Sequence, residues 1–319
     1  MKKILNFKKI KQATIILSQI TEIQKNKFID FLTNEIQTRK SEIIMANKRD
    51  LRKSEKLNFS MKQRLCMDQA GIEHLLARLS AIKKLNSHCG EIIEELTCIN
   101  ELHLKKVRVP IGVIMIIYES RPEVTIDVAA LCVKSGNVAI LKGGSEAIET
   151  NKVLFKCIRK ALQKIILPKE VANFIVDGDR SITNNLLKQS KYIDLVIARG
   201  GYDLVKYIQN NSTIPVLAHS AGGARIYIDK SADLDMATEI IVNAKVSKPS
   251  ACNSVDTVLV HKVISSRLIP LITKALQAKG VCVYTQGVDW NIEYLDLTIG
   301  IKVVSNIGEA IRFINTYGK

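Results

Sequence analysis

The sequence predicts an α/β protein whose main feature is a parallel sheet with helices on both faces. From residue 104 onward, apolar stretches of strand length alternate with amphipathic stretches of helix length. The connections between them are short, and the strands are continuous apolar runs. Parallel strands covered on both faces have this composition, because neither side of the sheet contacts water.

The first part of the chain has helical periodicity. Between about residues 8 and 85, apolar residues recur at helical spacing, as Ile16, Ile20 and Ile23 do. The stretch 54–60 interrupts the pattern, and 60–85 then predicts one long amphipathic helix with Ser60 as its N-cap.

A first alternating series of strands and helices follows. Strands are predicted at 104–120, 137–144, 173–177, 193–201 and 213–219, and helices at 121–136, 145–165, 180–190 and 202–212. Gly136 is suited to end the first of these helices, since glycine readily takes the left-handed conformation of a C-cap. Ser145 is suited to cap the second, and glutamates follow it in the first turns.

A second alternating series begins with a helix that ends at Pro249. The apolar stripe of this helix consists of Ala237, Ile240, Ile241 and Ala244. A strand at 255–260, a helix at 264–280 and a strand at 281–284 come next. Because 319 residues exceed what one compact core usually organises, we expect two domains, 1–243 and 244–319.

The composition excludes several classes of protein. No apolar run approaches the roughly 18 residues that a membrane span needs. Lysines interrupt the apolar residues near the N-terminus, which favours a helix over a signal peptide. The seven cysteines contain no C-x-x-C pair and do not cluster with the five histidines, so we expect no metal site. Scattered cysteines without a signal peptide fit a reducing cytoplasm.

The net charge of +16 has two interpretations. One is nucleic-acid binding, but the lysines are spread along the chain and aromatic residues are only 5%. The other is attraction of small anionic metabolites, and we expect this kind of partner rather than nucleic acid or a membrane.

Cys252 has two interpretations on local grounds. It lies in a loop between Pro249 and the strand at 255–260. Small neighbours would let a substrate approach, and Lys245 and Lys248 would favour a thiolate nucleophile. Most unpaired cysteines are buried hydrophobic residues, and the local sequence alone favours that alternative.

Two glycine turns follow buried strands, at 141–146 and at 199–201. Backbone N–H groups at such a turn can face an anion at a helix N-terminus. Neither turn is a G-x-G-x-x-G fingerprint, and each alone also fits an ordinary strand-to-helix connection. Two of them in one parallel sheet favour a nucleotide site.

Two further polar positions follow strands. His219 ends a strand at a glycine-containing turn, where it could act as an acid or base or satisfy a backbone group. Polar residues crowd the end of the strand at 104–120, from Tyr118 to Arg121. That place suits anion binding, and it equally suits a simple helix N-terminus.

These segments together resemble the gamma-glutamyl phosphate reductases, a family within the aldehyde dehydrogenase superfamily. The resemblance is carried by the stretches at 109–151, 193–201, 214–219, 227–245 and 249–261, in the family's order. "IYESRP", "KSGN" and "GGSEA" are typical of this reductase rather than of aldehyde dehydrogenases at large.

The resemblance implies a fold, a reaction and a cofactor. Residues 1–243 would form N-terminal helices and an NADP-binding domain, and 244–319 part of an α/β catalytic domain. The family reduces L-glutamyl 5-phosphate to L-glutamate 5-semialdehyde with NADPH and releases phosphate, in proline biosynthesis. A cysteine forms a thioester on the way.

Roles for single residues also follow from the resemblance. Cys252 matches the catalytic cysteine. The positions that match substrate and oxyanion contacts are Ser120, Arg121 and His219. The positions that match the cofactor contacts are Lys142, Gly143, Ser145, Arg199, Gly200, Gly201 and Glu293.

The sequence departs from the family pattern before the cysteine and at its end. "VSKPSA" precedes Cys252, with Lys248 where the family has Arg. The chain stops at Lys319, inside a motif that continues in the family, so we expect a C-terminally truncated catalytic domain. The full-length protein is expected to form a homo-oligomer. The alternatives are an inactive remnant that only binds nucleotide and a general aldehyde dehydrogenase.

Overall fold

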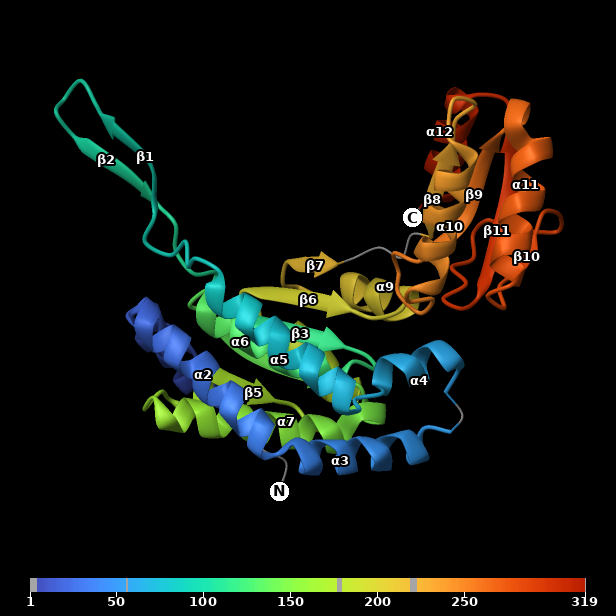
Figure 1. Cartoon of the computed structure of the whole chain (residues 1–319). Coiled ribbons are helices and arrows are strands. Elements are labelled where there is room, and N and C mark those ends of the chain that lie inside the picture. Colours follow the sequence, from blue (N-terminus) through green and yellow to red (C-terminus); the bar gives the residue numbers. More distant parts are fainter. Residues whose placement is uncertain (1–4, 56, 177–179, 219–222, 319) are drawn as a thin grey trace. The chain divides into compact units, whose positions relative to one another are not determined.

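The computed structural model describes residues 5–55, 57–176, 180–218 and 223–318. The chain divides into two compact units, which are described separately (Figure 1). Unit 1 comprises Met1–Leu57 and Leu65–His219, and unit 2 comprises Asn58–Arg64 and Ser220–Lys319.

Unit 1 is built on a five-stranded sheet in the order β5-β4-β3-β6-β7. The strands are β3 (Val113–Tyr118), β4 (Val138–Gly143), β5 (Ala172–Phe174), β6 (Leu195–Arg199) and β7 (Val216–Ala218). All four pairings are parallel, and every residue of β3 is buried. The predicted parallel sheet with two covered faces is therefore confirmed.

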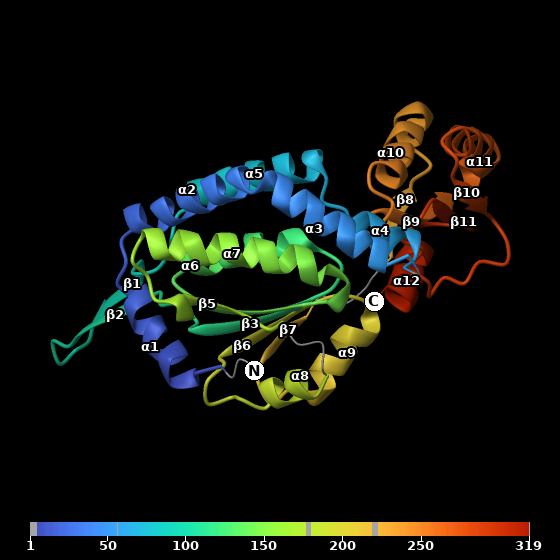
Figure 2. The same ribbon diagram turned by 90° about the horizontal axis from the view of Figure 1, so that it is seen from below.

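Helices cover both faces of this sheet (Figure 2). One face carries α6 (Pro122–Lys134) and α7 (Ile148–Lys164), and an outer layer packs on these two helices. The outer layer consists of α2 (Glu22–Thr38), α3 (Lys40–Lys53) and α5 (Gln69–Lys84). The other face carries α1 (Phe7–Ser18) and α9 (Tyr202–Asn211), with α8 (Arg180–Leu187) beside α9. Short 3-10 turns, η1 (Ser145–Ala147) and η2 (Lys169–Val171), precede α7 and β5.

Two N-cap predictions are wrong. The stretch 60–85 forms two helices, α4 (Phe59–Leu65) and α5, because the Asp68 carboxylate accepts the Gly71 N–H at 2.8 Å and starts a new helix. Ser145 does not cap α7, which begins at Ile148. The Asp50 carboxylate of α3 accepts the N–H groups of Glu149 and Thr150 instead, at 3.1 and 2.7 Å.

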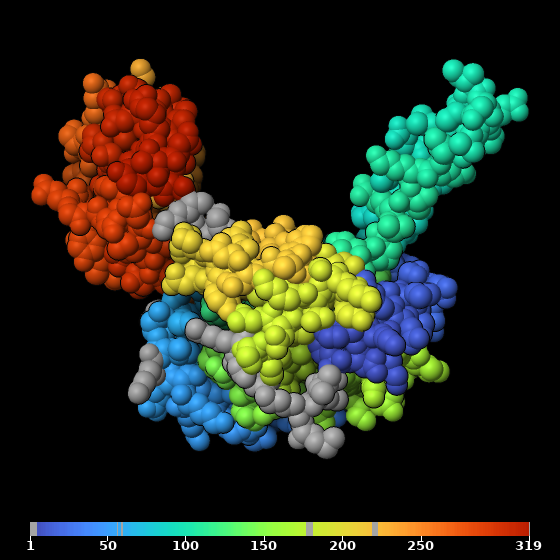
Figure 3. Space-filling view, turned by 180° about the vertical axis from the view of Figure 1, so that it is seen from behind, coloured from blue at the N-terminus to red at the C-terminus, as the bar shows by residue number. Residues whose placement is uncertain are grey.

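An antiparallel hairpin stands out from the rest of unit 1 (Figure 3). It consists of β1 (Ile92–Thr97) and β2 (His103–Val107), and every residue of both strands is exposed. The predicted single strand at 104–120 is thus divided between β2 and β3. Pro110 lies in the break, where it has no N–H to offer to a ladder.

Unit 2 has a four-stranded sheet in the order β10-β11-β9-β8, and all its pairings are parallel. Its strands are β8 (Ala224–Ile228), β9 (Val255–His261), β10 (Cys282–Tyr284) and β11 (Thr298–Val304). α10 (Leu234–Val246) and α11 (Lys262–Gln277) pack against each other and the sheet, and α12 (Ile307–Tyr317) contacts β8 and β11.

The division between the units differs from the expected domain boundary after residue 243. That position lies inside α10, and β8 pairs along β9 from Ala224 to Ile228. Both elements therefore belong to unit 2, since backbone pairing and apolar packing join them to β9. The periodicity of the sequence marks each element but does not say which sheet the element joins.

The described parts of the chain hold neither a membrane-spanning helix nor a cluster of metal-ligating side chains. No helix there is both long enough and apolar enough to cross a bilayer. Nor do three or more His, Cys, Asp or Glu side chains gather there in a way that could hold a metal ion.

Candidate active site

The carboxyl ends of three neighbouring strands of unit 1 meet at one edge of its sheet. Tyr118 at the end of β3 is level with Gly143 on β4 and with Arg199 on β6. The chain continues from β3 to β4 and β5 on one side, whereas β6 and β7 lie on the other. Parallel α/β sheets bind ligands in the crevice at such a change of direction. The two glycine turns noted in the sequence both lie at this edge.

The turn after β6 leads into the N-terminus of α9. Gly201 is the N-cap of α9, so the N-cap position offers no side chain to the first amides of the helix. The Gly201 N–H donates to Glu119 Oε2 at 2.8 Å, and a Cβ on Gly200 would lie 2.6 Å from the same oxygen. The positive end of α9 therefore holds an anionic group that the chain itself supplies. Arg199 is exposed at this turn.

The turn after β3 carries Ser120, one of the expected substrate-side residues. Ser120 is buried and has a φ of 41°, a left-handed conformation that is rare for residues other than glycine. Its N–H and its Oγ both donate to Glu146 Oε1, at 2.5 and 3.0 Å. Arg121, the next residue, is half-buried at the start of α6.

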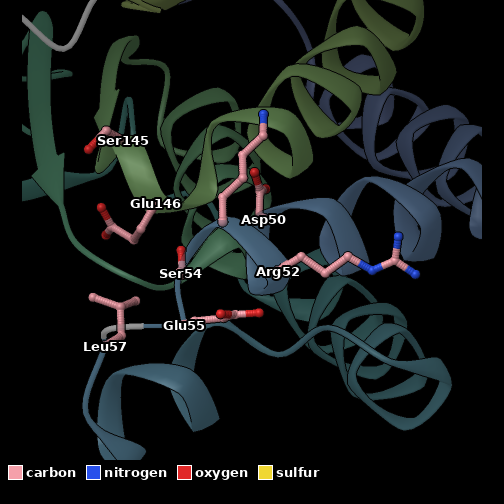
Figure 4. A pocket seen from close by; sticks show the side chains of 8 residues that line it. Asp50, Arg52, Ser54, Glu55, Leu57, Ser145 and Glu146 are labelled. Atoms are coloured by element: carbon pink, nitrogen blue, oxygen red, sulfur yellow. The ribbon is translucent and has the colours of Figure 1, made fainter.

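A pocket of about 450 Å³ lies beside the turn after β4 (Figure 4). Ser145 and Glu146 line it from η1, and the C-terminal end of α3 and the residues after it line the other side. The residues on that second side are Asp50, Arg52, Lys53, Ser54, Glu55 and Leu57. Asp50, and not Ser145, caps α7. Ser145 is exposed and lines the pocket.

A set of hydrogen-bonded, buried polar side chains lies next to this turn. Tyr118 Oη lies 2.7 Å from Thr125 Oγ1, which donates to Asn151 Oδ1 at 2.8 Å. The Asn151 Nδ2 atom is buried and has no partner among the described residues. A Cβ on Gly143 would lie 2.4 Å from that nitrogen, so the turn requires glycine there. Lys142 Nζ donates to the Gly143 carbonyl at 3.1 Å.

Unit 2 holds Cys252 in a loop that ends three residues later, where β9 begins. Arg64, on α4, donates two hydrogen bonds to the Ser250 carbonyl, from Nε at 2.9 Å and from Nη2 at 2.5 Å. Within the loop, the Ala251 N–H donates to the Lys248 carbonyl at 2.9 Å, and the Ser254 N–H to the Ala251 carbonyl at 3.0 Å. Cys252 itself is half-buried in this braced loop.

Other cysteines are less suited to act as nucleophiles. Cys132 and Cys157 are buried, and burial raises the pKa of each thiol to about 12. Burial also raises the pKa of the Cys66 thiol. Thiols with raised pKa values are protonated near neutral pH, and the thiolate is the attacking form.

Glu293 lies in the segment between β10 and β11, five residues before β11 begins. Its Oε1 atom is buried and has no partner among the described residues. β9 lies between β8 and β11, and all three are parallel, so residues just before β9 and β11 lie at the same edge of the sheet. Cys252 and Glu293 therefore both precede strands at the amino edge of unit 2.

A buried ion pair lies at this edge of unit 2. Lys245 Nζ is 3.6 Å from Asp256 Oδ1, and both side chains are almost fully buried. Burial raises the pKa of Asp256 to about 6, although the Lys245 charge opposes the shift. Burial likewise lowers the pKa of Lys245. Asp256 was not identified from the sequence, although a lone carboxylate in the apolar run 255–260 is a detectable signal.

One predicted site residue lies outside the described part of the chain, and three residues make contacts that the sequence did not predict. His219 lies outside the described residues. Glu119 and Glu146 lie in stretches that the sequence singled out, but their contacts with the turns were not predicted, and Arg64 was not identified at all. Nothing in the local sequence marks Arg64, because its partner is 186 positions away.

Comparisons with known proteins identify the family to which the chain is similar. The family model described as "Aldehyde dehydrogenase family" matches residues 11–282. The gamma-glutamyl phosphate reductase of Thermotoga maritima is 37% identical over 326 residues, which cover 97% of this chain and 79% of that protein. The one of Acetivibrio thermocellus is 40% identical, and the match covers 97% of this chain and 75% of that protein.

Solved structures give the same result. The crystal structure of the Thermotoga maritima gamma-glutamyl phosphate reductase has a TM-score of 0.88 at 36% identity, covering 98% of this chain and 79% of that one. An acetylating aldehyde dehydrogenase from Geobacillus thermoglucosidasius has a TM-score of 0.72 at 16% identity, covering 98% and 77%. The latter likeness concerns the fold alone.

Proposed function

This chain belongs to the gamma-glutamyl phosphate reductases, within the aldehyde dehydrogenase family, and we propose that it reduces L-glutamyl 5-phosphate to L-glutamate 5-semialdehyde in proline biosynthesis. In this proposal NADPH is the reductant and inorganic phosphate is the leaving group. The observation that carries the proposal is the braced loop of Cys252, with Arg64 on the Ser250 carbonyl just before the cysteine.

Cys252 is the nucleophile in this proposal. Its thiolate attacks the acyl carbon, a carbon–sulfur bond forms, and the carbon–oxygen bond to phosphate breaks, with the electron pair leaving on the phosphate. The product of this step is a thioester on Cys252. When NADPH is bound, it would supply the hydride that the thioester carbon accepts. The Cys252 sulfur then leaves as a thiolate, and the aldehyde is released.

This reaction needs no base that activates water, because the thioester is reduced by hydride and is not hydrolysed. In the reverse direction, phosphate and not water attacks the thioester. A hydrolytic aldehyde dehydrogenase would need such a base to release its product as an acid. The dependence of the reverse reaction on phosphate therefore separates the proposed reductase from a general aldehyde dehydrogenase.

The cofactor is a pyridine nucleotide, as in the aldehyde dehydrogenase family. In unit 1, we assign Lys142, Gly143 and Ser145 to its adenosine end and the turn Arg199, Gly200 and Gly201 to its diphosphate. In unit 2, Glu293, whose Oε1 has no partner within the described part of the chain, is assigned to the nicotinamide ribose. The assignment is supported by the glycines of the two turns and by the helix N-terminus at Gly201, where the Glu119 carboxylate lies in this structure.

NADPH rather than NADH is proposed as the reductant because of the pocket beside Ser145. Arg52 and Lys53 bring positive charge to its lining, the Asp50 carboxylate there is committed to the amides of α7, and the Glu146 carboxylate accepts from Ser120, which leaves Glu55 as the third carboxylate of the lining. A phosphate on the adenosine ribose is the group that such cations would select.

The test is the reverse reaction with the purified chain. Glutamate 5-semialdehyde, NADP⁺ and phosphate are mixed, and the absorbance of reduced nicotinamide is followed. We expect reduction that requires phosphate and is lost in Cys252→Ala but kept in Cys282→Ala, an exposed cysteine of the same unit. Reduction without phosphate would indicate a general aldehyde dehydrogenase, and nucleotide binding without turnover would indicate a remnant.

A further inference from the structure

Asp256 is the second residue of β9, in the middle of the unit 2 sheet. Its residue is only 3% exposed, and the rest of the strand is apolar apart from Thr257 and His261. A carboxylate is strongly disfavoured in such a place unless other groups hold it there. Its partners therefore report what the residue does in the fold.

The first partner joins Asp256 to the loop of Cys252. Lys245 lies in the last turn of α10, just before that loop, and Asp256 is the second residue of the strand that follows it. Their side chains meet across the base of the loop, with Lys245 Nζ 3.6 Å from Asp256 Oδ1. Ser254 Oγ adds a second tie to the Lys245 carbonyl at 3.3 Å. Lys245 is fully buried, and its Nζ makes no hydrogen bond to the described residues.

The second partner joins Asp256 to the segment of Glu293. The Tyr294 N–H donates to Asp256 Oδ1 at 3.3 Å, which is the same oxygen that faces Lys245. Tyr294 directly follows Glu293, and the charge of Glu293 is close enough to help raise the pKa of Asp256. A backbone hydrogen bond to Asp256 Oδ1 thus holds the segment that carries Glu293.

Other charged groups near this pair do not replace either partner. Arg225 of β8 attracts Asp256 at longer range, but its guanidinium donates to the carbonyls of Gly223, Trp290 and Tyr317. Asp296, in the segment that carries Glu293, attracts Lys245. Lys245 is therefore the cation that pairs with Asp256, and Tyr294 is its backbone donor.

We propose that Asp256 is a positioning residue that sets the loop of Cys252 and the segment of Glu293 in one arrangement, through Lys245 on one side and the Tyr294 amide on the other. The inference rests on the proposed function for the roles of Cys252 and Glu293. The consequence is that the thiol and the group that holds the nicotinamide ribose share one support.

Three substitutions separate the two ties. Asp256→Asn keeps an oxygen that can accept the Tyr294 N–H but removes the charge that pairs with Lys245. Asp256→Ala removes both ties. The double variant Lys245→Met, Asp256→Asn also lacks the ion pair but leaves no buried charge unpaired, so it keeps the test valid if the single variants unfold.

The first measurement is the rate at which iodoacetamide alkylates Cys252, followed by mass spectrometry of the peptide that contains it. We expect a fall of roughly tenfold or more in Asp256→Asn and in the double variant, since small displacements of a reacting group have effects of this size. Exposed Cys282 serves as the internal reference in the same samples. Asp229→Asn, a carboxylate after β8 that contacts Tyr227 and Ser231, is the matched control.

The second measurement is the KM for the nucleotide in the enzymatic reaction. It should rise in Asp256→Ala but stay close to wild type in Asp256→Asn, while kcat falls in both. A general loss of stability would not produce this division between the two variants. Alkylation of Cys252 at the wild-type rate in Asp256→Asn and in the double variant would overturn the inference.

The two proposals fail in different ways. If the chain has no reductase activity but the alkylation rates still separate Asp256→Asn from Asp229→Asn, the proposed function fails and the support of the Cys252 loop stands. If activity is present and every Asp256 variant keeps the wild-type kcat, KM and alkylation rate, the proposed function stands and the positioning role of Asp256 fails.

Discussion

The carboxylate of Glu119 occupies the N-terminus of α9 by accepting the Gly201 N–H at 2.8 Å. Glu119 follows β3 and Gly201 follows β6, so two neighbouring strand ends are joined at the turn assigned to the cofactor diphosphate. An internal carboxylate and a dinucleotide phosphate would both be stabilised at this helix end. They would therefore compete for it.

Removing the charge of Glu119 tests this competition. We expect Glu119→Gln to bind NADPH more tightly than wild type and to lose about 0.3–1 kcal/mol of stability, because the helix N-terminus loses its anion. A fluorescence titration with NADPH and a urea denaturation series measure the two effects. Weaker NADPH binding by Glu119→Gln would mean that the carboxylate assists the cofactor instead.

Replacing Cys252 tests the nucleophile. Cys252→Ala should lower the rate of the reverse reaction by about 10³-fold or more, with NADPH affinity unchanged, since the thiol makes a bond only during the reaction. The comparison is Cys282→Ala, which removes an exposed thiol of the same unit. Equal rates for the two variants would exclude Cys252 as the nucleophile.

The two hydrogen bonds from Arg64 to the Ser250 carbonyl predict a positioning effect. Arg64→Lys keeps the positive charge but cannot reproduce the two-nitrogen contact, so we expect kcat and the alkylation rate of Cys252 to fall by roughly tenfold. The matched control is Arg78→Lys, at a partly exposed guanidinium that pairs with Asp127 in unit 1. An unchanged alkylation rate in Arg64→Lys would show that the Cys252 loop keeps its conformation without the two hydrogen bonds from Arg64.

The raised pKa of Asp256 predicts an unusual pH dependence of stability. The folded protein keeps this proton up to about pH 6, whereas an unfolded carboxyl group loses it near 3.8. Between these values the folded state binds more protons, so this group stabilises the fold fully below about 3.8 and loses that effect as the pH rises through about 6. Urea denaturation at several pH values should show this slope in wild type and not in Asp256→Asn.

A pair of glycine substitutions tests the crowded turn after β4. A Cβ on Gly143 would lie 2.4 Å from Asn151 Nδ2 and 3.2 Å from the Tyr118 ring, so Gly143→Ala should cost about 1–3 kcal/mol. Gly71, inside α5, would meet nothing closer than 3.5 Å. Gly71→Ala should therefore raise stability by about 0.5–1 kcal/mol, because glycine is a poor helix former. Thermal unfolding of both variants checks the sign of each effect.

Local pattern explains most of what could be predicted about the fold. The buried strands β3, β4 and β6 are continuous apolar runs, and the turns after β4 and β6 carry paired glycines. Neighbouring parallel strands end at one edge of a sheet, and the register of Tyr118 with Gly143 and Arg199 brings the two turns to the same edge.

The N-cap of α7 shows where local pattern is insufficient. Ser145 has the right residue type and stands before a helical stretch, yet Asp50 caps the helix from 100 positions away in the chain. Asp68 acts locally instead: it accepts the N–H of Gly71, three positions later, and thereby divides the expected helix at 60–85. A capping residue is chosen by which oxygen reaches the amides, and several nearby side chains compete for that role.

The sequence by itself determined the class of the fold and the two glycine turns, and through its resemblance to a family it predicted Cys252 as the nucleophile. Those features depend on hydrophobic period and on residue type within a few positions of each other. Only the tertiary structure decided that β8 and α10 belong with β9, that Arg64 donates to the Ser250 carbonyl, and that Lys245 and Asp256 form a buried ion pair. These contacts depend on the packing of the whole unit, because a buried charge is tolerated only where a distant part of the chain brings its partner.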